Sequence, residues 1–405
     1  MNPLLILMAL LQGDLQPRPL ESRVTHVQPL SGLVLWDDSE HAATDAIQLE
    51  FFYLTYAELV PKKGEIDWRP LEKRLDAIRA RKHQAIVRLH DTYVGKPSGV
   101  PAYIRKLPDY RETLGKSEGK ETGFPDWSHP ELARFFLEFY AKFAAAYDRD
   151  PRIAYVETGF GLWSEYHIYD GPMKLGGTFP SKEFQASFLR HLSGVFQATP
   201  WMISIDAAAE DAAPFAAQRD LVELPFGVFD DSFLCKQHAK ENAPNWAFFG
   251  RDRWRRAPAG GEFSYYSKTD QKDALSAQGP HGIPFERAAR DFHLSFIIAN
   301  DQPEHRTMDR IRDAGLGCGY RLRVTDYRSG RGKSVLTLTN AGIAPLYHDA
   351  FVAIAGTRSK TSLKGLCPGD SRVCDVASVG QEVSVESDRL VPGQRIEFEA
   401  ALTGK

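Results

Sequence analysis

Two glutamates follow runs of residues that are typical of the rim of an active site. Glu165 lies in IAYVETGFGLWSEYH (153–167), where a β-branched run gives way to glycines and then to aromatic residues. Glu262 lies in PAGGEFSYY, which changes in the same way from small to aromatic residues. Hydrolysis of a glycosidic bond needs two carboxyl groups, one on each side of that bond. The pair therefore predicts a glycoside hydrolase that acts on a poly- or oligosaccharide.

The sequence neighbours of the two acids predict different roles for them. The apolar ring of Trp163 beside Glu165 should raise the pKa of this acid, which suits a residue that gives and takes a proton. Glu262 lies not far from Arg255 and Arg256, so we expect it to stay ionised and to act as the nucleophile. Two structural alternatives stay open: Glu165 as an acid of a surface loop, and Glu262 in an ion pair with one of these arginines.

Further polar and aromatic residues near the strand-like runs are candidates for binding the substrate. We expect Arg88 either to hydrogen-bond the nucleophile and keep it ionised or to form a structural ion pair. Asp230 and Asp231 either hold substrate hydroxyl groups or cap the next turn. The other candidates, each with a packing or structural role as the alternative, are His90, Asp91, Trp163, His167 and Tyr266.

These side chains need a frame that brings distant segments together. The chain alternates strand-like and helix-like runs over nearly all of its first three quarters, and this pattern predicts a (β/α)₈ barrel at residues 21–318. Both acids would then lie at the carboxyl ends of strands. A doubly wound sheet is the alternative, but no G-x-G-x-x-G follows the first strand. The expected strands are 32–36, 46–54, 85–90, 153–159, 201–206, 226–230, 260–266 and 295–300, and the expected helices are 69–83, 129–148, 181–196, 283–292 and 304–315.

The two ends of the chain differ from this central part. Short alternating runs predict a small antiparallel β-sandwich at residues 319–405, packed tightly on the barrel. Cys367 and Cys374 flank a turn-rich segment and either form a local disulfide or stay free thiols. The apolar run PLLILMALL is too short to span a bilayer and resembles a signal peptide. Residues 1–20 are therefore set apart as that peptide, and a periplasmic or secreted protein is expected.

The composition limits the class of partner. A formal net charge of -3 gives no reason to expect a nucleic acid or a membrane as a partner. The sequence has no C-x-x-C motif, and we expect neither a metal nor another cofactor. Aromatic residues make up 11% of the chain, which suits stacking on sugar rings as well as a large core. The composition does not predict the oligomeric state.

Several short motifs resemble one group of enzymes. YLTYAELVPKKGEIDW (53–68) resembles the second-strand signature of clan A glycoside hydrolases, in particular their β-galactosidase-like members. Within that clan, the domain-of-unknown-function 4832 group has segments similar to GFGLWSEYH, to DDSF (230–233), to GYR (319–321) and to NAG-x-AP (340–345). The resemblance covers most of residues 30–350 through scattered motifs.

This resemblance implies roles for particular residues. Glu165 matches the acid/base of the clan and Glu262 its nucleophile, which implies a retaining reaction in two displacement steps. Most clan members have Asn directly before the acid/base, where it contacts the 2-hydroxyl of the sugar. This chain has Ser164 there, so Ser164 becomes a further candidate for substrate binding.

Two other functions are compatible with the same residues. A barrel of this kind can bind carbohydrate without cleaving it, and this is the main alternative. The third hypothesis is a polysaccharide lyase with Tyr266 or His167 as its base. In each case we expect the long segment Gly95–Trp127 to form one wall of the pocket.

Overall fold

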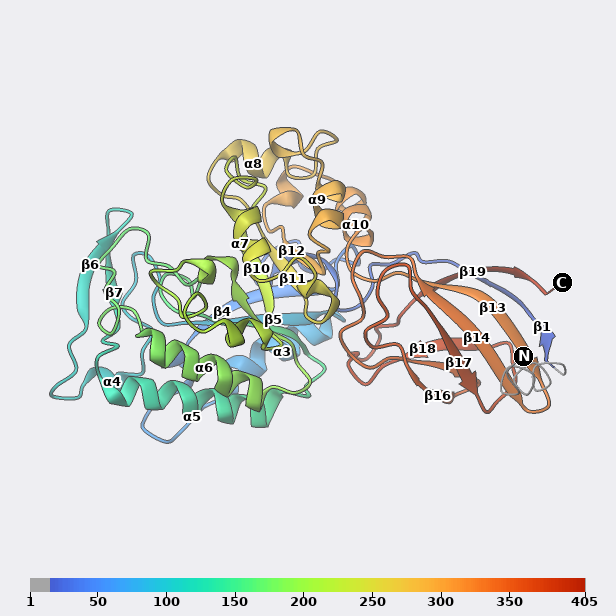
Figure 1. Ribbon diagram of the computed structural model, residues 1–405, viewed down its shortest axis with the longest axis horizontal. Coiled ribbons are helices and arrows are strands. Elements are labelled where there is room, and N and C mark those ends of the chain that lie inside the picture. The colour runs from blue at the N-terminus through green and yellow to red at the C-terminus, as the bar shows by residue number, and fades with distance from the viewer. Residues whose placement is uncertain (1–14, 405) are drawn as a thin grey trace.

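The central part of the chain forms a closed barrel of parallel strands (Figure 1). The computed structural model describes residues 15–404. The strands follow chain order around the barrel, and the last one pairs with the first. The predicted (β/α)₈ barrel is confirmed, and its closure excludes the doubly wound sheet. The eight strands are β3 (Gly32–Trp36), β4 (Leu49–Thr55), β5 (Gln84–His90), β8 (Ile153–Glu157), β9 (Trp201–Ser204), β10 (Gly227–Phe233), β11 (Ala259–Phe263) and β12 (Phe296–Ile298).

Apolar side chains fill the interior of the barrel. Alternate residues of each strand point inward. Among them, the side chains of Phe51, Met202 and Phe296 belong to one buried cluster. Within this cluster, the rings of Tyr155 and Phe296 stack with their centroids 5.0 Å apart. The opposite faces of the strands pack on the helices in a second, larger core. Because the interior is packed, a site for a substrate can form only beyond the ends of the strands.

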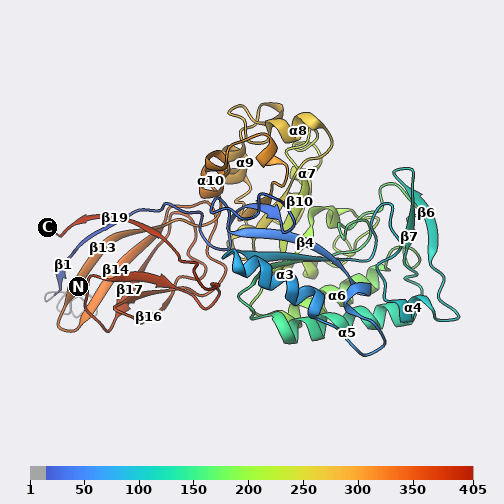
Figure 2. The same cartoon turned by 180° about the vertical axis from the view of Figure 1, so that it is seen from behind.

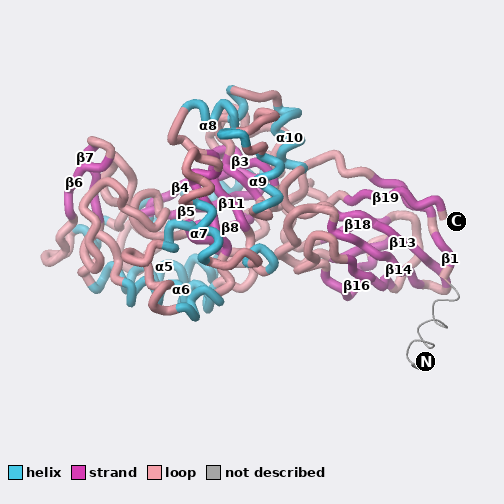
Figure 3. The backbone as a smooth tube through the Cα atoms, turned by 45° about the horizontal axis from the view of Figure 1, so that its top comes forward, coloured by secondary structure: helices cyan, strands magenta, loops and turns pink. Residues whose placement is uncertain are grey.

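Helices cover most of the outer face of the barrel (Figures 2 and 3). All five predicted helices are confirmed, and Ser181 caps its helix as expected by accepting a hydrogen bond from the Phe184 amide. The cover is incomplete between β9 and β10, where the chain has only the short 3₁₀ turns Ile205–Ala208 and Arg219–Glu223. The covering helices are α3 (Arg69–Ala80), α5 (Pro130–Tyr147), α6 (Lys182–Val195), α7 (Asn242–Phe248), α8 (Lys268–Asp273), α9 (Phe285–Asp291) and α10 (Met308–Leu316), and the loops contain the short helices α2 (Tyr56–Leu59) and α4 (Ala102–Arg105).

The C-terminal part forms the predicted β-sandwich. One sheet has six strands and the other has three, and they enclose a common apolar core. The pairing departs from the antiparallel prediction at one place, because β13 and β19 run parallel. The C-terminal strands are β13 (Leu322–Gly330), β14 (Lys333–Asn340), β15 (Phe351–Ile354), β16 (Thr357–Ser362), β17 (Ser371–Val376), β18 (Val383–Glu386) and β19 (Phe398–Thr403).

Two strands from the beginning of the chain complete this sandwich. β1 (Gln16–Pro17) pairs with β13, and β2 (Pro19–Ser22) pairs with β19. Residues 16–22 therefore belong to the sandwich, whereas the sequence predicted a signal peptide up to residue 20 and the barrel domain from residue 21. The apolar run at 3–11 lies outside the described residues, so the signal peptide and the exported location stay predictions. Within residues 15–404, no helix has the length and apolar character needed to cross a membrane.

The sandwich lies against the amino ends of the barrel strands (Figure 1). Arg389 is buried there, and its guanidinium donates hydrogen bonds to the carbonyl oxygen of Ile153 at 2.7 Å and to Oγ1 of Thr199 at 3.0 Å. The Gln84 side-chain amide donates to the carbonyl oxygen of Arg389 at 2.7 Å. These contacts confirm the tight packing of the two parts. They also leave the carboxyl ends of the strands free for a site.

Of the two alternatives for Cys367 and Cys374, a local disulfide or free thiols, the structure shows the second. Both residues are buried free thiols. Cys374 lies in β17 with its side chain in the apolar core of the sandwich, so packing fixes its direction.

Candidate active site

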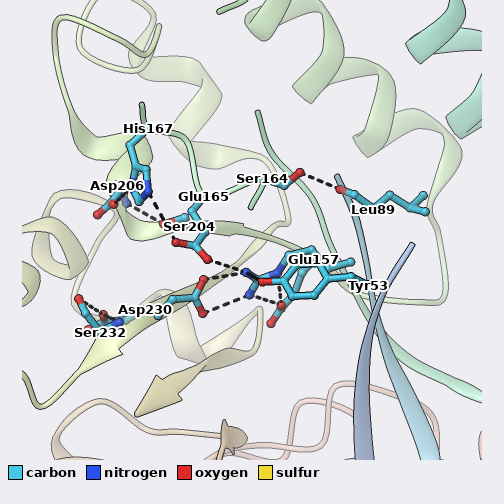
Figure 4. Close-up of polar contacts among 12 residues, drawn as sticks. Tyr53, Leu89, Glu157, Ser164, Glu165, His167, Ser204, Asp206, Asp230 and Ser232 are labelled. Carbon is cyan, nitrogen blue, oxygen red and sulfur yellow. Dashed lines mark hydrogen bonds and ion pairs between the residues drawn. The ribbon is translucent and has the colours of Figure 1, made fainter. Parts of the chain in front are cut away.

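A tightly wound loop directly after β8 holds Glu165 (Figure 4). Three residues around it have left-handed backbones, with φ of 52° at Trp163, 63° at Ser164 and 64° at Tyr166. A Cβ on Gly159 would lie 2.0 Å from the carbonyl oxygen of Ser164, so the turn requires glycine at that position. Strained backbone of this kind persists only where the surrounding structure fixes it, and it is concentrated at functional sites.

Glu262 lies on β11 after two glycines that the packing requires. A Cβ on Gly260 would lie 2.2 Å from the ring of Phe296, and one on Gly261 would lie 2.2 Å from the carbonyl oxygen of Asp230. The GGE motif therefore lets β11 approach β10 and the barrel interior before it presents the acid. Glu262 is half-buried, and no residue in the described part of the chain donates a hydrogen bond to its carboxylate.

A buried arginine on β5 joins several of the acids beneath the site. The Arg88 guanidinium donates to Tyr53 Oη at 3.1 Å and to Glu165 Oε1 at 3.0 Å. It also contacts one oxygen of Glu157 at 2.8 and 2.5 Å and both oxygens of Asp231 at 2.9 and 3.1 Å. Of the two roles expected for Arg88, a hydrogen bond to the nucleophile or a structural ion pair, the structure shows ion pairs with Glu157, Glu165 and Asp231. The contact with the predicted acid/base arises because the Arg88 side chain points from β5 toward β8 and β10.

A cavity of about 630 Å³ lies over this cluster, within the range of small-molecule sites. The two predicted catalytic acids both line it. Its walls combine carboxyl groups with aromatic rings, which is the composition that a carbohydrate site needs. The lining residues are Trp36, Tyr53, Tyr93, Glu118, Trp163, Glu165, His167, Tyr169, Ser204, Asp206, Asp230, Asp231, Ser232, Glu262, Tyr265 and Tyr266.

Aromatic side chains form one wall of the cavity. The rings of Trp163 and Tyr169 stack 6.1 Å apart with an interplanar angle of 19°. The Tyr169 hydroxyl donates a hydrogen bond to Glu118, at the turn between β6 (Thr113–Ser117) and β7 (Lys120–Phe124). The long segment predicted as a pocket wall therefore reaches the cavity, and it does so as a hairpin.

Burial governs the ionisation of both acids. It raises the pKa of Glu165 well above the ordinary value of 4.5, and the charges of Asp231 and Glu262 raise it further. This confirms the expected direction for Glu165. Burial, followed by the charge of Asp231, also raises the pKa of Glu262 well above 4.5.

The direction of this pKa shift is opposite to the one expected for Glu262. The two arginines expected near it have other partners. Arg256 forms an ion pair with Glu223 at 2.7 Å, and the guanidinium of Arg255 lies 4.7 Å from the centre of the Trp254 ring. The alternative of a structural ion pair for Glu262 is excluded by the same contacts.

Four of the expected binding residues do not line the cavity, and one of them is the buried Arg88. Ser164 is buried and donates its hydroxyl hydrogen bond to the carbonyl oxygen of Leu89 at 2.7 Å (Figure 4). His90 is buried with its ring 5.3 Å from that of Tyr93, and burial lowers the pKa of His90 to about 3. Asp91 is buried too, and burial raises its pKa to about 7. Each of these side chains therefore has a structural position at the end of β5.

Asp230 lines the cavity, but its carboxylate is bound by the protein. It accepts hydrogen bonds from the Ser232 amide at 3.0 Å, from Asn242 Nδ2 at 2.7 Å and from Trp246 Nε1 at 3.3 Å. The alternative role of capping the next turn fits these contacts, which also anchor α7. The remaining expected residues, Trp163, His167, Asp231 and Tyr266, do line the cavity.

The site also contains residues that were not predicted from the sequence. Glu157 and Asp206 each lie at or just after the end of a barrel strand, so the rule that selected Arg88 and Asp231 would have found them. His167 Nδ1 lies 2.6 Å from Asp206 Oδ2. Glu118 and Tyr169 come from loops, and no sequence signal marks them.

Comparisons with known proteins identify structures with a similar fold but do not establish a function for this chain. No family model and no curated protein matches the chain. The similar solved structures include a glycoside hydrolase family 30 subfamily 8 xylanase from Clostridium acetobutylicum (11% identity, 92% of this chain and 98% of that chain, TM-score 0.39). The catalytic domain of a β-amylase from Paenibacillus polymyxa is another (8%, 73% and 99%, TM-score 0.42). A third is a GH5_18 protein from Bifidobacterium longum subsp. infantis (10%, 68% and 69%, TM-score 0.42).

These values are too low to say anything about the chemistry of this chain. The resemblance to the domain-of-unknown-function 4832 group also stays a prediction. Among residues 15–404, no group of three or more His, Cys, Asp or Glu side chains is arranged to hold a metal ion. The functional argument therefore depends on the geometry of the cavity.

Proposed function

We propose that this protein is a retaining glycoside hydrolase that acts on a poly- or oligosaccharide. The observation that carries the proposal is the meeting of Glu165 and Glu262 in one aromatic-walled cavity. They come from the fourth and seventh strands of the barrel, counted from β3. Enzymes with this fold place their catalytic groups at the carboxyl ends of the strands.

In the first step, Glu165 gives its proton to the leaving glycosidic oxygen while Glu262 attacks the anomeric carbon. The raised pKa of Glu165 supplies the protonated acid at neutral pH. Glu262 must lose its own proton before it attacks. Within residues 15–404 no donor is hydrogen-bonded to its carboxylate, so its charge is available to the positive charge that develops on the sugar in the transition state.

In the second step, Glu165 takes a proton from water, and the resulting hydroxide releases the sugar from Glu262. His167 is placed to orient Glu165 between the two steps. Its Nε2 lies 3.7 Å from Glu165 Oε2, and its Nδ1 is bound to Asp206. Asp206 thus holds the imidazole in position, as a carboxylate does for many catalytic histidines.

Replacement of each acid by its amide tests this mechanism. Glu165→Gln and Glu262→Gln should each lower turnover of natural oligosaccharides at least about 100-fold. Glu165→Gln should lose much less on a dinitrophenyl glycoside, because that leaving group needs no proton. Glu138→Gln on α5, with a half-exposed side chain, is the matched control and should keep full activity. Turnover at the wild-type rate in both active-site variants would rule out the mechanism.

A carbohydrate-binding barrel without catalysis is the second candidate. One observation favours it: burial raises the pKa of both acids, which opposes the ionised form that a nucleophile needs. Such a protein would bind oligosaccharides and release no reducing ends at any pH between 5 and 9, and Glu262→Gln would leave its affinity unchanged.

The lyase hypothesis has little support from the cavity. Tyr266 and His167 do line it, but none of the lining residues is Lys or Arg. The uronate groups on which lyases act would face carboxyl groups there, and like charges repel. Release of an ultraviolet-absorbing unsaturated product would nevertheless identify a lyase directly.

A further inference from the structure

The Arg88 guanidinium divides its hydrogen bonds unequally among three carboxyl groups. Asp231 takes both terminal nitrogens, with Nη1 to Oδ2 at 2.9 Å and Nη2 to Oδ1 at 3.1 Å. Glu157 takes Nε at 2.8 Å and Nη2 at 2.5 Å through a single oxygen. Glu165 receives only one contact, from Nη1 to Oε1 at 3.0 Å, and shares that nitrogen with Asp231.

Water contributes little to neutralising this cluster. The side chains of Arg88 and Glu157 are fully buried, while Asp231 is 8% and Glu165 12% exposed. One positive charge cannot balance three carboxylates in such a place, so at least one of them holds a proton. Two parallel N–H···O bonds make the strongest arginine–carboxylate pair. Of the three carboxyl groups, Asp231 is therefore the one that we expect to be ionised. The proton is then held by an acid with weaker contacts to Arg88.

We propose that Asp231 is a positioning residue that keeps the proton on Glu165 by occupying both terminal nitrogens of Arg88. The inference rests on the proposed role of Glu165 as the catalytic acid. Without Asp231, the guanidinium would pair with Glu165 and stabilise its carboxylate, which cannot protonate a leaving group. The charge of Asp231 is, after burial, the largest cause of the raised pKa of Glu165.

Other ionisable groups also face Glu165, and their effects differ from that of Asp231. The charge of Glu262 on β11 acts in the same direction as that of Asp231. A protonated His167, 3.7 Å away, would act in the opposite direction. Glu157 on β8 and Tyr53 on β4 accept hydrogen bonds from the same guanidinium. Tyr53 Oη and Asp231 Oδ2 both share the nitrogen Nη1 with Glu165, and of these two only Asp231 is a carboxyl group.

A carboxyl titration measures this effect without requiring turnover. The protein is labelled with ¹³C on its glutamate side-chain carboxyls, and the Glu165 resonance is assigned with Glu165→Gln. Asp231→Asn should lower the titration midpoint of Glu165 by about one pH unit or more. Asp230→Asn is the matched control: it changes the preceding residue, whose carboxylate is bound by Ser232 and Asn242, and should leave that midpoint in place.

An unchanged or higher midpoint in Asp231→Asn would overturn the proposal. If this variant does not fold, Asp231→Ser gives the same test with a smaller uncharged side chain. If neither folds, a Glu165 midpoint near 4.5 in the wild type would overturn the proposal.

Enzyme kinetics provide the second measurement. In Asp231→Asn, the alkaline limb of kcat/KM should move to lower pH by the same amount as the midpoint, with activity retained on the acid side. A merely structural role would lower activity at every pH without moving the limb. A shifted midpoint in a protein that cleaves no glycoside would support the role of Asp231 and reject the proposed function. Hydrolysis of a glycoside together with an unmoved midpoint would support the proposed function and reject the role of Asp231.

Discussion

Arg88→Met should test how much of the barrel's stability depends on charge balance under the cavity. The variant removes six hydrogen bonds and leaves Glu157, Glu165 and Asp231 without a cation. Breaking a buried ion pair by removing one partner typically costs about 3–5 kcal/mol. At about pH 8 we expect this loss of unfolding free energy, which for a chain of 405 residues corresponds to a lowering of the melting temperature by about 4–6 °C.

The loss of unfolding free energy in Arg88→Met should depend on pH, and the pKa of Glu157 determines whether it grows or shrinks as the pH rises. Burial raises this pKa from 4.5 to about 7. Between pH 4.5 and pH 7 the folded protein keeps the Glu157 proton, whereas the unfolded chain releases it. The contribution of Glu157 to the unfolding free energy is therefore fully present below pH 4.5 and is lost as the pH rises through 7. Arg88 opposes the rise, and its removal should raise the folded pKa further. The variant should therefore lose stability more steeply with pH than the wild type.

Thermal and urea denaturation at pH 5 and pH 8 provide the measurement. At pH 5 the raised pKa values of Glu157 and Glu165 favour their neutral forms, and the loss should shrink to about 1–3 kcal/mol, the cost of unmade hydrogen bonds. The double variant Arg88→Met/Glu157→Gln should recover at least about 1 kcal/mol at pH 8, because it removes one buried charge. Equal losses at the two pH values, or no recovery in the double variant, would refute the reasoning.

Three further predictions concern the loop, the junction and the aromatic wall. Gly159→Ala places a Cβ 2.0 Å from the Ser164 carbonyl oxygen, so it should displace the loop and lower kcat/KM at least about tenfold, as kinetics would show. Arg389→Ala should lower the unfolding free energy by about 2–4 kcal/mol in denaturant melts, yet change kcat/KM less than about twofold, because it lies at the opposite end of the barrel. Tyr169→Ala should raise KM about five- to tenfold with little change in kcat. The reason is that the Tyr169 ring, stacked on Trp163, is expected to bind the substrate in its ground state and in its transition state alike. A fall in kcat alone would contradict this.

The sequence predicted the frame of this protein well. All eight barrel strands and the five expected helices lie where the hydrophobic periodicity placed them, because that pattern records which faces of each element are buried. The placement of Glu165 and Glu262 in one cavity followed from the same frame, since the carboxyl ends of parallel strands meet at one end of a barrel.

The contacts of single side chains could not be predicted in this way. Ser164 was assigned to the substrate from its place beside Glu165, but a left-handed backbone turns it toward the carbonyl oxygen of Leu89. Similarly, nothing in the sequence near residue 16 indicates that this segment pairs with β13, more than 300 residues away.

The sequence by itself determined the barrel, the sandwich and the two acids at the ends of strands, because these depend on local periodicity and on the rules of parallel sheets. Only the tertiary structure decided which acids share Arg88 and which of them are buried. β5, β8 and β10 supply the members of that cluster, and the ionisation of each carboxyl depends on desolvation and on its neighbours in space. Neither the desolvation of a carboxyl group nor the set of its neighbours in space can be read from the order of residues along the chain.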